Sequence, residues 1–130
     1  MAGSVPDSIE TSLLNLLFRN TAFTATATVY VALTTTNPTD ASAGTEVTTS
    51  GTAYARQSVT FGAPSGGATS NTNTVTFPVA TANYGTVEGF ELYDASTSGT
   101  RLAWCDDPSV AVNSGQQAQF AIGSITISAS

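Results

Sequence analysis

The sequence predicts a mainly β protein, a β-sandwich or jelly-roll-like antiparallel domain with one short N-terminal helix. One stretch near the start has helical spacing, whereas the rest consists of short alternating runs rich in Thr, Val, Tyr, Phe and Ile. Gly, Asn, Pro and Asp separate these runs as closely as in sandwiches and Greek-key barrels. The 130 residues suit a single domain, 1–130, with an N-terminal arm and helix in 1–20 and the β-sandwich in 26–130.

The helix is predicted over residues 6–18. Pro6 suits a first turn, Ser4 and Asp7 have the spacing of a capping box, and Asn20 suits the exit from the helix. Apolar residues then recur at helical spacing, at Ile9, Leu13, Leu16 and Leu17.

The first strand is predicted in "TATVYVALTTT", residues 26–36, and it ends at the turn containing Pro38. A loop is expected over 37–50. Alternation places side chains on two faces of this strand: Val29, Val31 and Leu33 on one, Tyr30 and Ala32 on the other.

A second strand is predicted in the run "GTAYARQSVTF", residues 51–61, followed by the loop "APSGG". Strict alternation would direct its side chains to two faces: Ala55, Gln57, Val59 and Phe61 to one, and Tyr54, Arg56, Ser58 and Thr60 to the other.

The later strands are expected within residues 73–80, 86–95, 100–105, 109–113 and 116–130. Pro78 should put the strand that contains it at an edge or a bulge, because proline cannot donate to a ladder. Gly99 is suited to a positive φ between the strands of 86–95 and 100–105, and residues 112–116 resemble a second hairpin connection.

The charge composition excludes several classes of partner. The chain has three arginines, no lysine and no histidine against nine acids, for a net charge of −6. No basic stripe exists to bind phosphates, so no nucleic acid is expected, and such a surface also repels anionic membranes. No apolar run approaches the length of a spanning helix. Cys105 is the single cysteine, so no intrachain disulfide can form, and we interpret it as an inert thiol.

The inventory of catalytic residues predicts that the chain is not an enzyme. Without histidine, Ser-His-Asp and Cys-His arrangements and His-containing zinc sites cannot form. Carboxylate pairs remain, and we interpret all of them as solvated turn or edge charges: Glu88 with Glu91 or Asp94, and Asp106 with Asp107. The alternatives are glycan hydrolysis by such a pair and a calcium site formed by Asp94, Asp106 and Asp107. We expect no cofactor and no metal.

Three residues are candidates for a subunit interface: Arg56, Tyr54 and Trp104. The planar donor group of Arg56 could bind a carboxylate or carbonyl across an interface, but pairing with one nearby acid within the chain is the favoured interpretation. Trp104 and Tyr93 could stack on a sugar or a peptide, although core or interface packing is favoured.

Four stretches resemble a group of small tailed-bacteriophage virion proteins that are usually labelled tail-fibre or decoration-type structural proteins. They are residues 13–41, 51–67, 69–95 and 112–127, and the most specific parts are "VYVALTTTNPTD" and the strand "YARQSVTF". The resemblance implies a virion component with a β-sandwich or jelly-roll body, assembled as a multimer, and it brings no catalytic residues.

The favoured hypothesis is therefore a virion structural protein of the capsid decoration, or cement, type, which bridges capsomers. It would bind the major capsid protein or other virion proteins, assemble in the host cytoplasm and form a homo-oligomer, with a trimer favoured. The N-terminal helix or the arm before it would contact the shell or a sister subunit. The alternative is a tail or tail-fibre component that binds host surface glycan or forms part of the tail.

Overall fold

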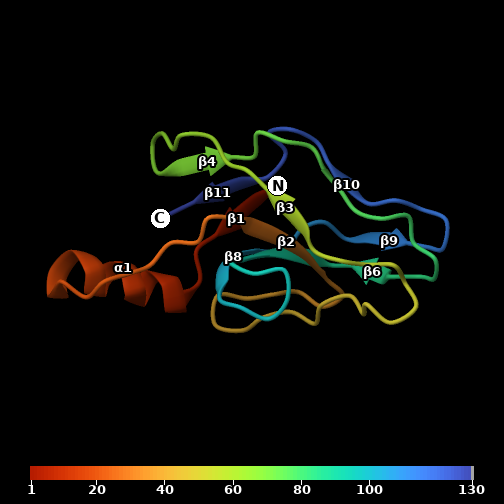
Figure 1. Cartoon of the computed structure of the whole chain (residues 1–130), viewed down its shortest axis with the longest axis horizontal. Helices are drawn as coiled ribbons and strands as arrows, with labels where there is room; N and C mark the ends of the chain where they lie inside the picture. Colours follow the sequence, from red (N-terminus) through yellow and green to blue (C-terminus); the bar gives the residue numbers. More distant parts are fainter. Residues whose placement is uncertain (130) are drawn as a thin grey trace.

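The computed structural model describes residues 1–129, and within them the prediction of a mainly β fold with one helix is confirmed (Figure 1). In chain order the elements are β1 (Ala2–Ser4), α1 (Asp7–Arg19), β2 (Val29–Thr34), β3 (Gln57–Val59), β4 (Ala68–Ser70), β5 (Val75–Thr76), β6 (Gly85–Val87), β7 (Gly89–Tyr93), β8 (Arg101–Cys105), β9 (Val110–Val112), β10 (Gln119–Phe120) and β11 (Thr126–Ser128).

Seven strands form one sheet in the order β3-β2-β7-β8-β1-β11-β4. The sheet curls until its two edges meet, because Phe61, after β3, bridges Asn71, after β4, and the Thr72 N–H donates to the Thr60 carbonyl at 2.8 Å. Two small antiparallel ladders, β5–β10 and β6–β9, extend from the end of this sheet that is remote from α1 (Figure 1).

Residues 2–4 are not a free arm. They form β1, which pairs in parallel with β11 through Ala2 opposite Thr126 and meets β8 where Ser4 lies opposite Trp104. The sheet is therefore not purely antiparallel, and the β region extends beyond residues 26–130. The predicted capping box is wrong as well, because Ser4 lies in β1 and the residue that precedes α1, Pro6, makes no side-chain cap.

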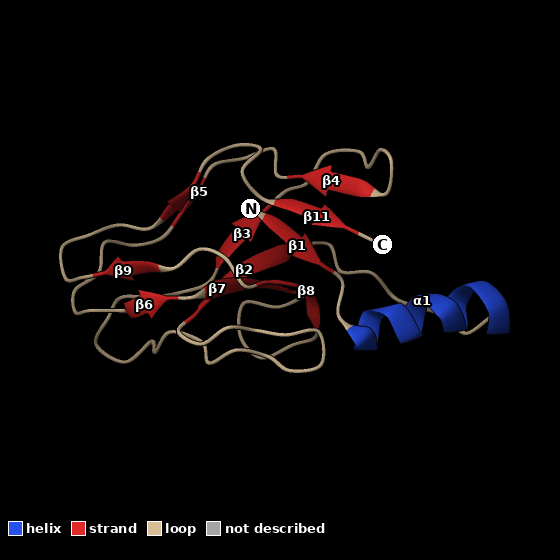
Figure 2. Ribbon diagram, turned by 180° about the vertical axis from the view of Figure 1, so that it is seen from behind, coloured by secondary structure: helices blue, strands red, loops and turns tan. Residues whose placement is uncertain are grey.

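α1 ends as predicted, since Asn20 has a left-handed conformation, with φ 51°, after Arg19. Ile9 is the only buried residue of the helix. The rest of α1 projects beyond the strands at one end of the molecule (Figure 2). Within residues 1–129, no helix has the length and apolar character needed to cross a membrane.

The hydrophobic core lies on the concave side of the curled sheet. Val31 and Leu33 of β2 face it as predicted, at 0% and 1% exposure. The Phe90 ring packs edge-on against Phe120 at 5.3 Å between ring centroids, and Phe77 meets Phe120 at 6.3 Å. Burying an aromatic side chain of this size contributes about 1.5–3 kcal/mol, so these rings fasten the ladders of the remote end to the main sheet.

The strand predicted over 51–61 is mostly irregular, and only Gln57–Val59 is regular strand. Ala53 has a positive φ of 64°, which breaks the alternation. Tyr54 consequently lies in the core with Val59 instead of on the opposite face, and its ring stacks on Phe77 at 6.0 Å.

Of the two later turns that the sequence predicts, the one at Gly99 is confirmed and the hairpin at 112–116 is wrong. Gly99 has φ 83° between the paired strands β7 and β8, as predicted. The turn at 112–116 joins β9 to β10, but these strands pair with β6 and β5 instead of with each other, so it is not a hairpin. A further departure lies in residues 86–95, which form two strands, β6 and β7, in different sheets.

The loop 37–50 packs on the convex side of the sheet. Pro38 lies directly against Gly89, where any Cβ would overlap with the Pro38 ring and with the Cys105 carbonyl. Glycine at this position therefore allows the loop to approach the sheet closely. The centre of the sheet is covered on both faces, by the core on one side and by this loop on the other.

Candidate functional site

Arg56 fixes two loops at once. Its Nε and Nη2 donate to Oε1 and Oε2 of Glu46, both at 2.9 Å, in the bidentate geometry that favours arginine. Its Nη1 donates to the Ala95 carbonyl at 2.9 Å and to the Ser98 carbonyl at 2.8 Å. The guanidinium also lies 4.0 Å from the centre of the Tyr93 ring, in a cation–π contact.

Tyr54 connects this pair to the core. Its hydroxyl donates to Glu46 Oε1 at 2.8 Å and accepts the Leu33 N–H at 3.0 Å, beyond the point where β3 stops pairing with β2. Partial burial opposes ionisation of Glu46, but hydrogen bonds from Arg56 and Tyr54 outweigh it and lower the pKa of that carboxyl. Burial, together with the neighbouring carboxylate, raises the pKa of Tyr54.

Arg101 makes a second, deeper contact. Its Nη1 lies 3.2 Å from Oε1 of Glu91, whose side chain is 1% exposed. Nη1 also donates to the Thr39 carbonyl at 2.8 Å, and Nη2 donates to the Asp40 carbonyl at 2.9 Å. The other carboxylate oxygen of Glu91 accepts the Tyr93 hydroxyl at 2.9 Å. Burial, with the carboxylate of Glu91 second, raises the pKa of Tyr93 to about 12.

The two networks, each centred on an arginine, are called the arginine clamps below: Arg56 with Glu46, and Arg101 with Glu91. Together they hold the loops 37–50 and 95–98 against the convex face of the sheet. Pairing of Arg56 with one nearby acid agrees with the favoured interpretation of the sequence. Its role at a subunit interface stays a prediction, as do those of Tyr54, which is 3% exposed, and Trp104.

The clamps change the interpretation of Glu91. We expected a solvated charge, but the loop 37–50 covers this carboxylate, and only its paired arginine and hydrogen bonds offset the cost of burying it. Asp106 and Asp107 are exposed, as a turn after β8 requires. The sequence analysis did not single out Glu46 or Arg101 and did not pair Glu91 with Arg101, and the one available signal was the scarcity of basic residues.

The aromatic candidates do not form an exposed platform. Tyr93 presents one ring face to Arg56, and Trp104, half-buried on β8, lies opposite Glu91 of β7. The Trp104 indole N–H is buried without a hydrogen-bond partner in residues 1–129. The Tyr93 ring therefore packs within the layer that the clamps hold.

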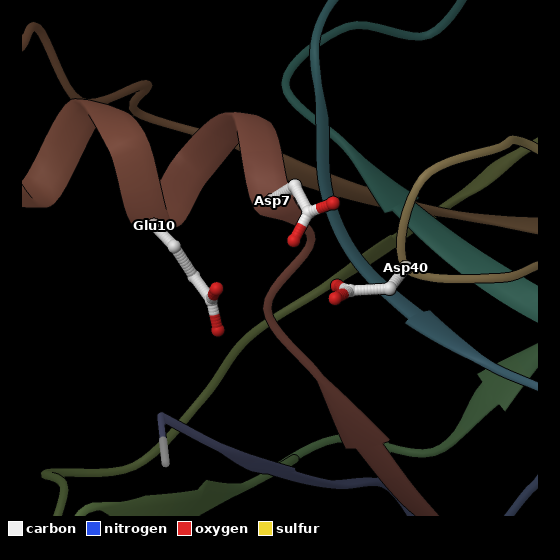
Figure 3. Close-up of side chains that lie close together, drawn as sticks. All are labelled: Asp7, Glu10 and Asp40. Carbon is white, nitrogen blue, oxygen red and sulfur yellow. The ribbon is translucent and has the colours of Figure 1, made fainter.

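The alternative calcium site, formed by Asp94, Asp106 and Asp107, has no counterpart among the acid clusters of the described residues. In the described part of the chain, the carboxylates that meet are those of Asp7, Glu10 and Asp40, whose oxygens lie within 4.8 Å of one another (Figure 3). Asp7 and Glu10 come from the first turn of α1, and Asp40 comes from the loop held by Arg101. All three are exposed, and such groups commonly meet without a cation.

The charge of Asp40 acts directly on Asp7. A shared hydrogen bond with Asp40, and then repulsion between the two carboxylates, raises the pKa of Asp7. The carboxylates of Asp7 on the helix and Asp40 on the loop therefore repel each other when both are charged. Hard-cation binding would need ligands beyond these three.

A cleft beside β9 and β10 lacks groups suited to catalysis. It has a volume of about 430 Å³, and its walls are mainly apolar residues of β9 and of other segments, together with glutamines 116, 117 and 119. The Cys105 thiol is 1% exposed, and burial raises its pKa, which disfavours the reactive thiolate.

A protein-family model described as "Podophage GP4 fiber I protein gp80" matches residues 4–128. The match runs from the last residue of β1 to the last residue of β11, and so covers almost the whole fold. A comparison with curated proteins finds no match.

Proposed function

The chain belongs to the podophage GP4 fiber I protein gp80 family, and from this premise we propose that it is a non-enzymatic structural subunit of a virion tail fibre. The family is one of structural proteins of tailed-phage virions, and a location in the virion follows from it. The match over residues 4–128 carries the proposal. The family is described as one of fibre proteins, which favours the tail over the capsid.

The architecture supports a structural role. The arginine clamps turn a long connection, residues 37–50, into a covering layer on the sheet. Loops are ordinarily the more mobile parts of a fold. A subunit that must persist outside the cell benefits from loops that are fixed by bidentate ion pairs and buried hydrogen bonds.

The proposal includes assembly with further subunits. The chain would form a homo-oligomer, a trimer being favoured, would contact other virion proteins and would assemble in the host cytoplasm. Closed symmetry is the usual outcome for repeated contacts between identical subunits. Capsid decoration stays as a prediction that competes with the fibre role.

The test is to locate the chain on intact particles. An antibody against the recombinant protein, coupled to gold, should label the tail, and a cryo-EM map should place the fold of Figure 1 in fibre density. Label spread over the capsid lattice would replace the fibre role with capsid decoration. Absence of the chain from purified particles would overturn both.

Host binding needs a separate measurement. Recombinant protein is added to host cells before the phage, and adsorption of the phage is then counted. Reduced adsorption would indicate that the subunit itself binds a surface receptor. Unchanged adsorption, with tail labelling intact, would limit its role to building the fibre.

A further inference from the structure

A polar hollow lies between the two loops that Arg56 joins. It measures about 300 Å³, at the lower limit of the volumes of small-molecule sites. Its walls come from three short stretches of the chain: Glu46 and Thr49, then Tyr54, Ala55 and Arg56, then Ser96, Thr97 and Ser98. The contacts of Arg56 that hold these loops therefore also fix the shape of the hollow.

Arg56 keeps one hydrogen-bond donor for a ligand. A guanidinium has five N–H groups, and four of them donate to Glu46, to the Ala95 carbonyl and to the Ser98 carbonyl. Within residues 1–129, the second N–H of Nη2 has no acceptor. The side chain is only 7% exposed, and an unpaired donor on a buried cation is costly. An oxygen atom from solvent or from a ligand is therefore needed beside Nη2.

Glu46 offers an acceptor next to this donor. Its Oε1 accepts the Tyr54 hydroxyl and the Arg56 Nε–H, whereas Oε2 accepts one N–H from Nη2. A carboxylate oxygen can accept two hydrogen bonds, so Oε2 has room for a second donor, and the side chain of Glu46 is 33% exposed. A free donor and a free acceptor thus lie on two atoms 2.9 Å apart.

Four hydroxyl groups surround this pair of atoms. They belong to Thr49, Ser96, Thr97 and Ser98, which are all exposed and which line the hollow. In the described part of the chain, none of these four side chains makes a hydrogen bond, although the Ser98 carbonyl is held by Arg56 at 2.8 Å. Hydroxyls on loops that are already fixed cost less ordering on binding.

The charges of the hollow favour a neutral ligand. Among residues 1–129, Glu46 and Arg56 are the charged residues that line it, and they neutralise each other. An anionic ligand would be repelled by the carboxylate and a cationic ligand by the guanidinium. Ala55 and the methyl groups of Thr49 and Thr97 add apolar wall. The ligand that matches these groups is neutral, carries neighbouring hydroxyls and has a carbon skeleton of small size.

We propose that this hollow binds one neutral sugar unit of a glycan. Two neighbouring hydroxyls of the sugar would meet Arg56 Nη2 and Glu46 Oε2, one as acceptor and the other as donor. Identification of the glycan as one on the host surface rests on the proposed fibre function. The chemistry of the hollow stands without that function.

The first experiment is a titration of the recombinant protein, followed by nuclear magnetic resonance, with D-glucose, D-galactose and N-acetyl-D-glucosamine as probes. Concentrations up to about 100 mM detect the weak affinity of a single sugar unit. The backbone amide signals of residues 96–98 and the Arg56 Nε–H signal should shift and saturate with at least one sugar. Absence of a saturable shift with all three sugars, or shifts confined to other residues, would overturn the proposal.

Two further probes test the class of ligand. D-Glucuronate carries a carboxylate and should bind at least about 3-fold more weakly than D-glucose, because Glu46 repels it. Acetamide is neutral but has no hydroxyl, and it should not saturate these signals. Saturation by acetamide at the concentrations that the sugars require would show a site for amides, and would overturn the assignment to a sugar.

Variants test the hollow itself. Thr97→Val keeps the shape of the side chain but removes a hydroxyl, and it should raise the dissociation constant of the tightest-binding sugar by about 3–10-fold. Thr97→Trp fills the hollow and should abolish saturation. Thr86→Val, at an exposed threonine of β6 outside the hollow, is the matched control and should change nothing. Thermal melting checks that all three variants fold. Unchanged dissociation constants in both Thr97 variants would overturn the proposal.

The outcome is separable from the fibre role. Gold labelling of the tail without any sugar binding would leave the fibre role standing and overturn the sugar site. Sugar binding by a chain that labels the capsid would keep the sugar site and overturn the fibre role.

Discussion

Replacing Arg56 with alanine tests whether the clamp stabilises the fold. The change removes two hydrogen bonds to Glu46, two to the carbonyls of Ala95 and Ser98, and the contact with Tyr93. Each hydrogen bond to a charged group has a net value of about 1.5–3 kcal/mol, but the groups left behind can regain water in part, because the side chain of Glu46 is 33% exposed.

We therefore expect Arg56→Ala to lower the free energy of unfolding by about 2–4 kcal/mol, less than the loss of a partner in a fully buried pair. For a domain of this length, the change corresponds to a fall in Tm of about 10 °C. The measurement is thermal and urea unfolding followed by circular dichroism, with an unchanged far-ultraviolet spectrum at 20 °C as the check that the variant folds.

Arg56→Lys is the matched control. Lysine keeps the charge but cannot form the two parallel bonds to Glu46, so its loss should fall between wild type and Arg56→Ala. Glu46→Gln is made alone and together with Arg56→Ala, so that wild type, the two single variants and the double variant form a double-mutant cycle. The coupling free energy between the two side chains should exceed about 1 kcal/mol. A Tm for Arg56→Ala within about 2 °C of wild type would refute the clamp as a stabilising element.

Three further predictions concern the remaining charges. Arg101→Met should destabilise by about 3–5 kcal/mol in urea unfolding, because it leaves Glu91 charged and buried, and a smaller loss than for Arg56→Ala would contradict the deeper burial of this pair. Because the pKa of Glu46 is lowered in the folded state, this carboxylate stabilises the fold fully at pH values above the ordinary pKa of glutamate. That contribution is lost as the pH falls through the folded-state pKa. The Tm should therefore decrease below about pH 4.5, and it should decrease less in Glu46→Gln. The raised pKa of Asp7 has the opposite effect on stability, since its favourable contribution is lost as the pH rises through the folded-state pKa. Asp40→Asn should therefore raise the Tm at pH 7 but not at pH 3. An equal change in Tm at both pH values would show that repulsion is not the cause.

Local patterns determined much of the fold. Alternation placed Val31 and Leu33 in the core, helical spacing located α1 to within one residue at each end, and Gly99 adopted the turn conformation that its position required. These features depend on neighbours within a few residues, so their physical causes are present in the printed sequence.

The clamps and the second strand depended on contacts between distant residues. Arg101 lies 62 positions from Thr39, whose carbonyl it binds, and no local rule joins them. Glu91 is buried because a loop folds over it, and Tyr54 reaches the core because a positive φ at Ala53 shifts the register. A strand pattern predicts which face a side chain takes, but not what covers that face.

The sequence by itself determined the mainly β class, the position of the one helix and the shortage of catalytic groups, because each follows from residue types and short-range spacing. Only the tertiary structure decided that residues 2–4 lie beside residues 126–128, that two of the three arginines are paired within the chain, and that Leu14, Leu17 and Phe18 of α1 are exposed. The physical reason is that strand pairing and burial are set by which distant segments meet, and a single sequence read locally carries no record of that choice.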